Sequence, residues 1–296
     1  MRKLTNLTMK VIESGSDEAR LAHLESRRWI PYSAASNIID ELTTFLTLPA
    51  KRRMENRLIV GKSNDGKTTL AEHFRDAINP KVDPDAERTI SPVLYCEAPP
   101  LPDESRLYSQ ILRSMGVPHR AAASACVLWD LVCFNIPRFG VKIILIDDIH
   151  HSLAGSNTQQ HRYLNTIKFM GHELKISIVL LGIKQAFDAI QIDDQMLNRF
   201  MPRPLPTWVY GREYQNLLVS FESFLPLRHP SILAEPKLAK LLIEMSNGSI
   251  GELSLLLNEA SKLAINSKDE KITEELLRTL DWIPFAERRE RTLSLV

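Results

Sequence analysis

Four short apolar runs in the first two thirds of the chain predict buried strands. They lie at residues 58–60, 93–96, 143–146 and 176–182. Segments with apolar residues at helical spacing occur before, between and after these runs, at 38–46, 69–78, 103–116, 121–135 and 159–173. Strands that alternate with helices favour a parallel sheet with helices on both faces. We therefore expect an α/β core over residues 29–209.

The pattern changes after this core. Helical spacing continues while strand-like runs stop, with helices expected at 214–225, 236–245, 250–265 and 272–280. We expect a small all-α lid domain over residues 210–281, followed by a charged tail over residues 282–296. Residues 1–28 are polar and weakly periodic. They predict an N-terminal arm that is helical only in part, between Ser16 and Ser26.

Composition limits the function classes. With 44% hydrophobic and 25% charged residues, the 296-residue chain is ordinary for a soluble globular protein. The net charge of +1 means that any nucleic-acid surface has to be local. Three cysteines without metal-like spacing favour a reduced, cytoplasmic compartment. An apolar signal core and a membrane-length apolar run are both lacking, so no membrane partner is expected.

The segment after the first apolar run carries the clearest chemistry. Residues 61–68, Gly-Lys-Ser-Asn-Asp-Gly-Lys-Thr, match G-x-x-x-x-G-K-[ST] between a strand and a helix. The two glycines let successive backbone amides point inward, where the positive end of the helix dipole also faces. We expect Lys67 to reach the β- and γ-phosphates of a nucleotide and the Thr68 hydroxyl to hold Mg²⁺. The nucleotide-binding residues predicted are Gly61, Lys62, Ser63, Asn64, Asp65, Gly66, Lys67, Thr68 and Thr69.

An acidic pair ends the third apolar run. In open α/β sheets ligands bind at the carboxyl ends of the strands, where Asp147 and Asp148 are expected. Asp147 is placed to hold Mg²⁺, directly or through water, and Asp148 to orient the attacking water. A simple loop cap is the alternative. His150 and His151 are expected to diverge in direction as adjacent residues, which makes them a poor metal-binding pair, and one of them is instead a candidate sensor of the γ-phosphate or of the neighbouring copy.

An aromatic and aliphatic group precedes the core, at Trp29-Ile30-Pro31-Tyr32. Two functions fit this pattern equally well. The rings either clamp an adenine by stacking or pack as a structural staple.

These motifs, in this order, resemble the TniB/TnsC family of AAA+ regulators of DNA transposition, which is related in role to the phage protein MuB. The resemblance extends over about residues 27–285. Besides the phosphate loop and residues 29–32, it rests on CEAPPLPDESRLYSQIL (96–112), LIDDIHH (145–151), IVLLGIKQAF (178–187), LNRF (197–200) and GSIGEL (248–253).

The resemblance implies an AAA+ P-loop core followed by a helical lid. It also implies binding of ATP with Mg²⁺ and assembly into rings or helical filaments on double-stranded DNA of any sequence. Such a protein recruits or activates a transposase, meets a targeting partner of the TniQ type, sometimes linked to a CRISPR effector, and disassembles on ATP hydrolysis.

The resemblance also assigns an arginine finger, a positive charge given to the γ-phosphate of the neighbouring copy. Arg199 matches that position and Arg203 is the reserve candidate. Without the family, Arg199 is equally well a cap near a helix end.

Three departures from the usual AAA+ pattern predict slow intrinsic hydrolysis. The second acid is Asp148 where Glu is usual, no polar sensor is evident after Gly182, and the turn at 248–252 lacks an arginine.

The DNA surface is predicted at Arg106, Arg113 and Arg120. Arg106 and Arg113 are seven residues apart and share a helix face, so they suit sequence-independent phosphate contacts. An ordinary solvated face is the alternative. The tail arginines, Arg288, Arg289 and Arg291, are candidates for DNA or partner contact, with simple disorder as the default.

Three rival functions stay open. A helicase-loader-like AAA+ ATPase differs from a transposition regulator only through family likeness. A small-molecule kinase needs an arginine-rich lid, whereas Arg228 is expected in a loop and Arg278 comes late. A non-hydrolysing scaffold conflicts with an intact Lys67 and Asp147.

Overall fold

The computed structural model describes residues 4–26, 28–80, 89–120, 122–153, 156–191, 194–285 and 287–288. The chain divides into two compact units, each described below by itself. The α/β unit consists of residues 33–63 and 67–205. The helical unit consists of residues 1–32 and 206–296, with residues 64–66 grouped with it.

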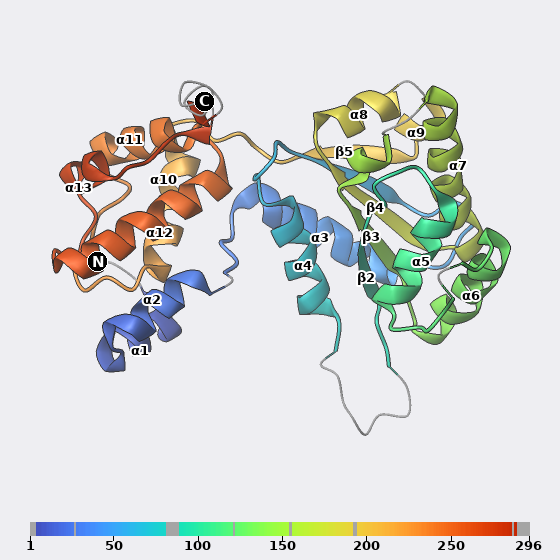
Figure 1. Ribbon diagram of the computed structural model, residues 1–296, viewed down its shortest axis with the longest axis horizontal. Coiled ribbons are helices and arrows are strands. Elements are labelled where there is room, and N and C mark those ends of the chain that lie inside the picture. Colours follow the sequence, from blue (N-terminus) through green and yellow to red (C-terminus); the bar gives the residue numbers. More distant parts are fainter. Residues whose placement is uncertain are drawn as a thin grey trace. The chain divides into compact units, whose positions relative to one another are not determined.

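A five-stranded sheet forms the centre of the α/β unit, in the order β2-β3-β4-β1-β5 (Figure 1). Its strands are β1 (Asn56–Val60), β2 (Val93–Glu97), β3 (Ile143–Asp147), β4 (Ser177–Gly182) and β5 (Phe200–Pro204). Every neighbouring pair is parallel. β3 and β4 are buried along their whole length, as near-continuous apolar runs require when helices cover both faces. The predicted parallel α/β core is confirmed.

Helices surround the sheet. They are α3 (Ser33–Thr47), α4 (Lys67–Ile78), α5 (Glu104–Ser114), α6 (Ala125–Arg138), α7 (Asn157–Leu174), α8 (Lys184–Gln191) and α9 (Asp194–Leu197), with a 3₁₀ turn, η1 (Ile149–Leu153), after β3. Three of them, α5, α6 and α7, begin after an N-cap residue. α5 begins after Asp103, whose carboxylate accepts the Arg106 amide at 2.8 Å. α6 begins four residues later than predicted because Ser124 is its N-cap.

The helical unit contains the predicted lid helices and two more. α10 (Arg212–Phe224), α11 (Pro236–Ser246), α12 (Ile250–Ser267) and α13 (Glu274–Thr279) pack with α2 (Asp17–Glu25) around one apolar core, and α1 (Asn6–Ser14) packs against α2. The predicted N-terminal arm is therefore part of the same unit as the lid. Leu24 of α2 belongs to that core.

A buried ion pair joins the arm to the rest of the helical unit. Arg20 of α2 is fully buried and binds both carboxylate oxygens of Glu270, which follows α12. Its Nε also donates to the Pro226 carbonyl at 2.9 Å. Because these partners are more than 200 residues away in sequence, the polar composition of the arm concealed its packed position.

The aromatic group before the core is packed in the helical unit. Tyr32 meets Trp208 edge-on, with ring centroids 5.3 Å apart and planes at 77°. Burial raises the pKa of Tyr32 above its ordinary value. These contacts are those of a packing staple. Within the described ranges, no helix has the length and apolar character needed to cross a membrane.

Candidate active site

The predicted phosphate loop connects β1 to α4 at the carboxyl edge of the sheet. Its first amide, that of Gly61, donates to the Gly182 carbonyl at the end of β4, at 3.2 Å. Asn64 and Gly66 have positive φ angles of 65° and 80°. Glycine adopts this left-handed region without strain and asparagine tolerates it. The backbone therefore turns tightly here, as a phosphate cradle requires.

Lys67 begins α4 and lies under the loop. The residue is only 6% exposed. Its Nζ donates to the carbonyl oxygens of Gly61 at 3.1 Å and Lys62 at 2.6 Å. Carbonyl oxygens satisfy an ammonium group without neutralising its charge. The loop therefore holds a positive charge that an anionic group can meet, beside the positive end of the α4 dipole.

Asp147 is the centre of a hydrogen-bonded group at the end of β3. It is 1% exposed. Its Oδ2 accepts from the Thr68 hydroxyl at 2.6 Å and from the Tyr95 hydroxyl at 3.0 Å, while its Oδ1 accepts the Asp148 amide at 2.8 Å. Burial and the Asp147 charge raise the pKa of Tyr95, so the phenol stays a donor. A hydroxyl and a carboxylate oxygen in contact are the hard oxygen ligands that suit Mg²⁺.

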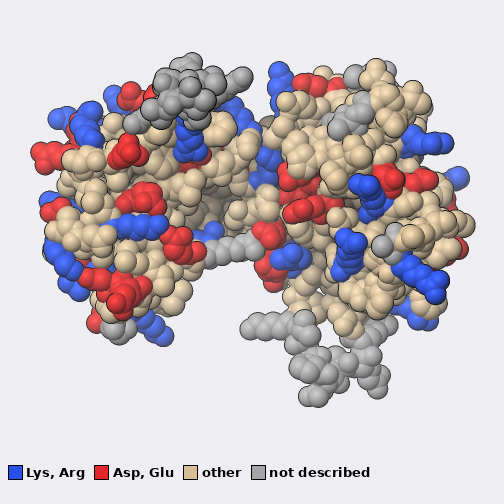
Figure 2. All heavy atoms as spheres, viewed as in Figure 1, with Lys and Arg blue, Asp and Glu red and all other residues tan. Residues whose placement is uncertain are grey.

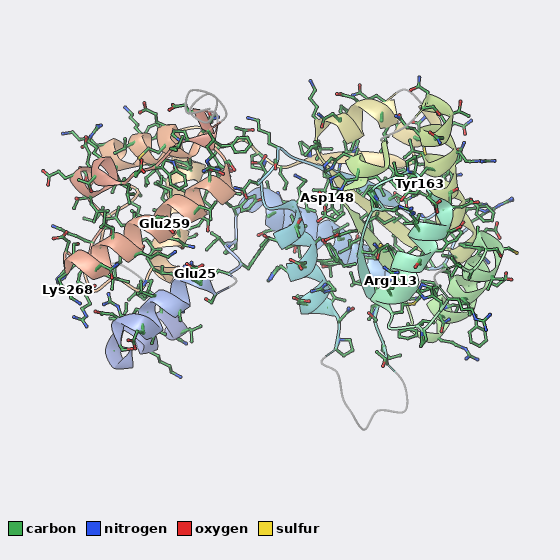
Figure 3. All side chains as sticks on the ribbon, in the orientation of Figure 1. Glu25, Arg113, Asp148, Tyr163, Glu259 and Lys268 are labelled. Atoms are coloured by element: carbon green, nitrogen blue, oxygen red, sulfur yellow. The ribbon has the colours of Figure 1, made fainter. Side chains whose placement is uncertain are left out.

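The second acid is presented differently. Asp148 has a φ of 50°, and its side chain is 40% exposed. Aspartate is among the few residues that enter this backbone region readily. Figure 3 labels Asp148 at the edge of the α/β unit. The two carboxylates therefore differ in their surroundings, since that of Asp147 is buried and hydrogen-bonded and that of Asp148 is exposed.

The two candidate finger arginines lie at different places on the edge strand β5. Phe200 is in register with Asn56, and Arg203 is in register with Ile59 near the phosphate loop. Arg199 therefore precedes the amino end of the strand. Four residue steps along a strand span roughly 13 Å. Arg199 consequently lies at the sheet edge opposite the loop of its own chain.

Arg203, the reserve candidate, is held within the chain. Both oxygens of Glu41 on α3 accept from its guanidinium at 2.6 Å, and Arg57 shares the same carboxylate. These bonds raise the pKa of Arg203 further. A side chain fixed in this way is a structural brace for β5 and a poor donor to another molecule.

Comparison with protein families identifies the chain. The model described as "Bacterial TniB protein" matches residues 20–210, which include the loop, both aspartates and both candidate finger arginines. The chain belongs to the TniB family. The match spans more than half of this sequence. No curated protein sequence matches this chain.

Solved structures similar to this TniB-family protein show its fold class. The ORC2 protein of Aeropyrum pernix with ADPNP and ADP has a TM-score of 0.63 at 17% identity, covering 86% of this chain and 70% of that one. ORC1 of the same organism, in complex with DNA, has a TM-score of 0.60 at 16% identity, covering 88% and 68%. DnaA of Aquifex aeolicus, bound to AMPPCP, has a TM-score of 0.52 at 14% identity, covering 89% and 68%. The fold is that of AAA+ proteins, and family and fold together support ATPase activity.

Two of the three predicted DNA arginines come together in the TniB-family protein. Arg106 and Arg113 are exposed on α5 and line an open hollow of about 290 Å³. Arg113 is labelled in Figure 3, and Figure 2 shows Lys and Arg side chains over the part of the α/β unit that carries α5 and α6. The other lining residues are Pro99, Pro100, Ser105, Ser109 and Gln110. Arg120 is exposed beyond the end of α5 and is not among them.

Sequence reasoning missed two supporting residues. Tyr95 was recognised as part of a strand, but its bond to Asp147 depends on the pairing of β2 with β3. Glu41 appeared to be the polar side of a helix, yet it accepts from two arginines. Neither has a local signal, because both partners come from other elements.

One of the three tail arginines, Arg288, lies within the described residues. Arg288 stacks over Trp282 and Phe285 and donates to Glu252 of α12. Arg289 and Arg291 lie outside the described residues.

Proposed function

We propose that this TniB-family protein is an ATP-dependent, DNA-binding AAA+ regulator of DNA transposition. It oligomerises as a ring or helical filament on double-stranded target DNA and recruits or activates a transposase. The observation that carries the proposal is the family match over residues 20–210, which contains a phosphate loop and acidic pair with the geometry of a nucleotide site. A TniQ-type targeting protein is the further partner that the family implies.

In this proposal the phosphate loop binds the triphosphate of ATP. The amides of residues 61–66 surround the phosphates, and Lys67 moves its donors from the Gly61 and Lys62 carbonyls to the β- and γ-phosphate oxygens. Asp148 accepts from the water that attacks the γ-phosphate. The attack breaks the bond between the γ-phosphorus and the bridging oxygen, and ADP leaves.

Thr68 and Asp147 are the proposed ligands of Mg²⁺. Their side-chain oxygens lie in contact, and Tyr95 and the Asp148 amide keep the Asp147 carboxylate in place. The bound ion offsets the negative charge that develops on the phosphates. Second-shell bonds of this kind orient the carboxylate that binds the metal.

Arg199 is the proposed finger and acts on the neighbouring copy. Its place at the amino end of β5, opposite its own phosphate loop, supports action between chains. The bonds of Arg203 to Glu41 support Arg199 over Arg203 in that role. Assembly is therefore part of the active site, since each nucleotide needs two chains.

Arg106, Arg113 and Arg120 are the proposed DNA contacts. Exposed arginines bind phosphates without reading sequence, and each contact makes binding more sensitive to salt. The hollow shared by Arg106 and Arg113 supports a contact by this pair, with Arg120 as an outlying one.

The test combines negative-stain imaging with sedimentation, using a duplex of arbitrary sequence. Samples contain ATP with Mg²⁺, ADP, or no nucleotide. We expect ordered rings or filaments on DNA only with ATP, and loss of them in Lys67→Ala. Lys168→Ala, at a half-buried lysine of α7 that donates to the Gln195 side chain at 3.3 Å, is the matched control and should assemble as the wild type does.

Two outcomes would contradict the proposal. Absence of DNA association in every nucleotide state would point to an NTPase that acts on a protein or small molecule. DNA assembly without any stimulation by a cognate transposase would favour a helicase-loader-like role.

A further inference from the structure

A histidine, His150, adjoins the candidate active site. It belongs to η1, which follows the acidic pair. Its Nδ1 is buried and has no hydrogen-bond partner within the described part of the chain. This nitrogen lies 3.9 Å from Oδ1 of Asp148, and the His150 side chain is 20% exposed. Leaving a buried polar atom unsatisfied is energetically unfavourable. Such a cost is often found where an atom has a function to perform.

The position of His150 is set by the core. Ile149, next to it, is fully buried. Gly182 at the end of β4 makes this packing possible, because a Cβ there would lie 2.8 Å from Cγ2 of Ile149 and 2.7 Å from Cβ of Ala186. Contacts under 3.0 Å are sterically excluded. The absence of a side chain at Gly182 thus lets η1 lie against the sheet and brings the His150 ring to the acidic pair.

The distance between His150 and Asp148 is too long for a hydrogen bond but close to one. A normal N–H···O bond has about 2.7–3.2 Å between the heavy atoms. A shift of less than about 1 Å, or one bridging water, would complete the contact. Hydrogen bonds at catalytic groups are often long before substrate binds.

We propose that His150 is a positioning residue for hydrolysis, whose Nδ1–H donates to the Asp148 carboxylate and holds it toward the attacking water. The effect of His150 on hydrolysis rests on the proposed ATPase function. The contact between Asp148 and His150 does not depend on that function. It also offers a reason why a shorter aspartate serves at this position, since a donor behind the carboxylate restricts where it points.

Surrounding charges favour a neutral ring with one N–H. Burial lowers the pKa of His150 most, His151 and Lys67 lower it further, and Asp148 and Asp147 oppose them. In a neutral imidazole one nitrogen donates and the other accepts, and the tautomer follows the hydrogen bond that is made. A carboxylate beside Nδ1 selects the Nδ1–H form.

His151 provides a matched control. It is exposed, and its ring lies beside that of His150 with centroids 4.4 Å apart and planes tilted by 50°, so the two side chains do not diverge as predicted. It has the same chemistry as His150 and the same sequence neighbourhood.

Nitrogen NMR of the full-length, nucleotide-free protein tests the contact directly. The His150 signals are assigned by their loss in His150→Gln. We expect mainly the Nδ1–H tautomer at neutral pH, and a change toward Nε2–H in Asp148→Ala. An Nε2–H tautomer in the wild type, unaffected by Asp148→Ala, would overturn the proposal whether or not the protein hydrolyses ATP.

Kinetics with DNA tests the consequence. His150→Leu should lower kcat roughly 10- to 100-fold, as loss of orientation does, while affinity for a fluorescent ATP analogue and sedimentation on DNA stay within about threefold. His150→Asn places an amide donor near the Nδ1 position and should recover most of the activity. His150→Gln, which places it near Nε2, should not.

The control and the failures are distinct. His151→Leu should lower kcat much less than His150→Leu does, and equal turnover of the two variants would refute the positioning role. If the wild type hydrolyses no ATP with DNA present, the proposed function fails, and the tautomer measurement alone decides the contact between His150 and Asp148.

Discussion

Both units of the protein bury charged side chains, but they do so in different ways. In the helical unit, Arg20 and Glu270 satisfy each other by paired hydrogen bonds, and the arginine is entirely enclosed. In the α/β unit, Lys67 and Asp147 are buried beside an open acid, Asp148, and the bonds of Lys67 go to backbone carbonyls. A buried charge that is neutralised within the chain belongs to stability. One that lies at the phosphate loop, next to an exposed acid, belongs to the candidate ligand site.

The largest effect on ATP turnover is expected at Arg199, the proposed arginine finger. Arg199→Ala should lower ATP turnover of the DNA-assembled protein by about 10³-fold or more, since a finger stabilises transition-state charge. Thermal unfolding of the monomer should change little. Arg203→Ala is the matched control. It should disturb packing around Glu41 and retain most of the turnover per assembled chain. If Arg203→Ala lost turnover and Arg199→Ala kept it, Arg203 would be the finger instead of Arg199.

The next largest effect, on the free energy of unfolding, is expected at the buried Arg20–Glu270 ion pair. Arg20→Ala removes the main partner of the buried Glu270 carboxylate and leaves it only the Arg228 amide at 3.3 Å and the Arg228 guanidinium at 3.9 Å. Breaking a buried pair in this way should lower the free energy of unfolding by about 3 kcal/mol. Denaturant unfolding monitored by tryptophan fluorescence would measure the loss. Nucleotide affinity should persist under conditions where the variant stays folded. Replacing the pair by apolar residues, as in Arg20→Met with Glu270→Leu, should recover much of the loss. A loss of nucleotide affinity equal in free energy to the loss of stability would contradict the view that the Arg20–Glu270 pair serves stability alone.

A smaller gain is expected at the open acid. Asp148→Glu lengthens the side chain by one methylene and should raise intrinsic turnover by about tenfold, since orientation of the nucleophile is sensitive to such distances. Asp147→Glu is the contrasting variant and should reduce turnover, because Asp147 is buried and fully bonded. Steady-state hydrolysis without DNA or partner measures both. Unchanged turnover in Asp148→Glu would mean that chain length at this acid does not limit the rate.

The smallest effect concerns pH. Burial on its own raises the pKa of Glu270, but the bonds from Arg20 and from the Arg228 amide outweigh it, so the pKa lies below its ordinary value of 4.5. A lowered folded-state pKa stabilises the fold above the unfolded-state pKa, and this stabilisation is lost as the pH falls through the folded-state value. The denaturant concentration at the unfolding midpoint should therefore decrease as the pH is lowered below about 4.5. In Glu270→Gln this decline should be shallower. An identical decline in both proteins would show that other carboxylates cause it.

Local and long-range features differed in how far the sequence predicted them. The phosphate loop, Asp147 and the alternation of strands and helices each lie within a short segment, so their pattern was sufficient. The place of Arg20 was not predictable in the same way, because its partner is 250 residues away. Tyr95 and Glu41 were missed for a related reason, since the partners of each come from other elements. Gly182 was noted for lacking a polar neighbour, and the structure shows that its missing side chain makes room for η1.

The position of Arg199 has a consequence for symmetry. The candidate site and Arg199, the proposed finger, lie at opposite ends of the strands of one sheet. A contact that brings this arginine to another chain's phosphate loop therefore joins unlike surfaces. A pair of chains joined in this way leaves one loop vacant and one proposed finger unused. Two-fold pairing uses the same patch twice and does not satisfy this requirement. Heterologous contacts either close into a ring or continue as an open helix. The number of complete sites is then set by how many neighbours each chain has, so a lone chain has none.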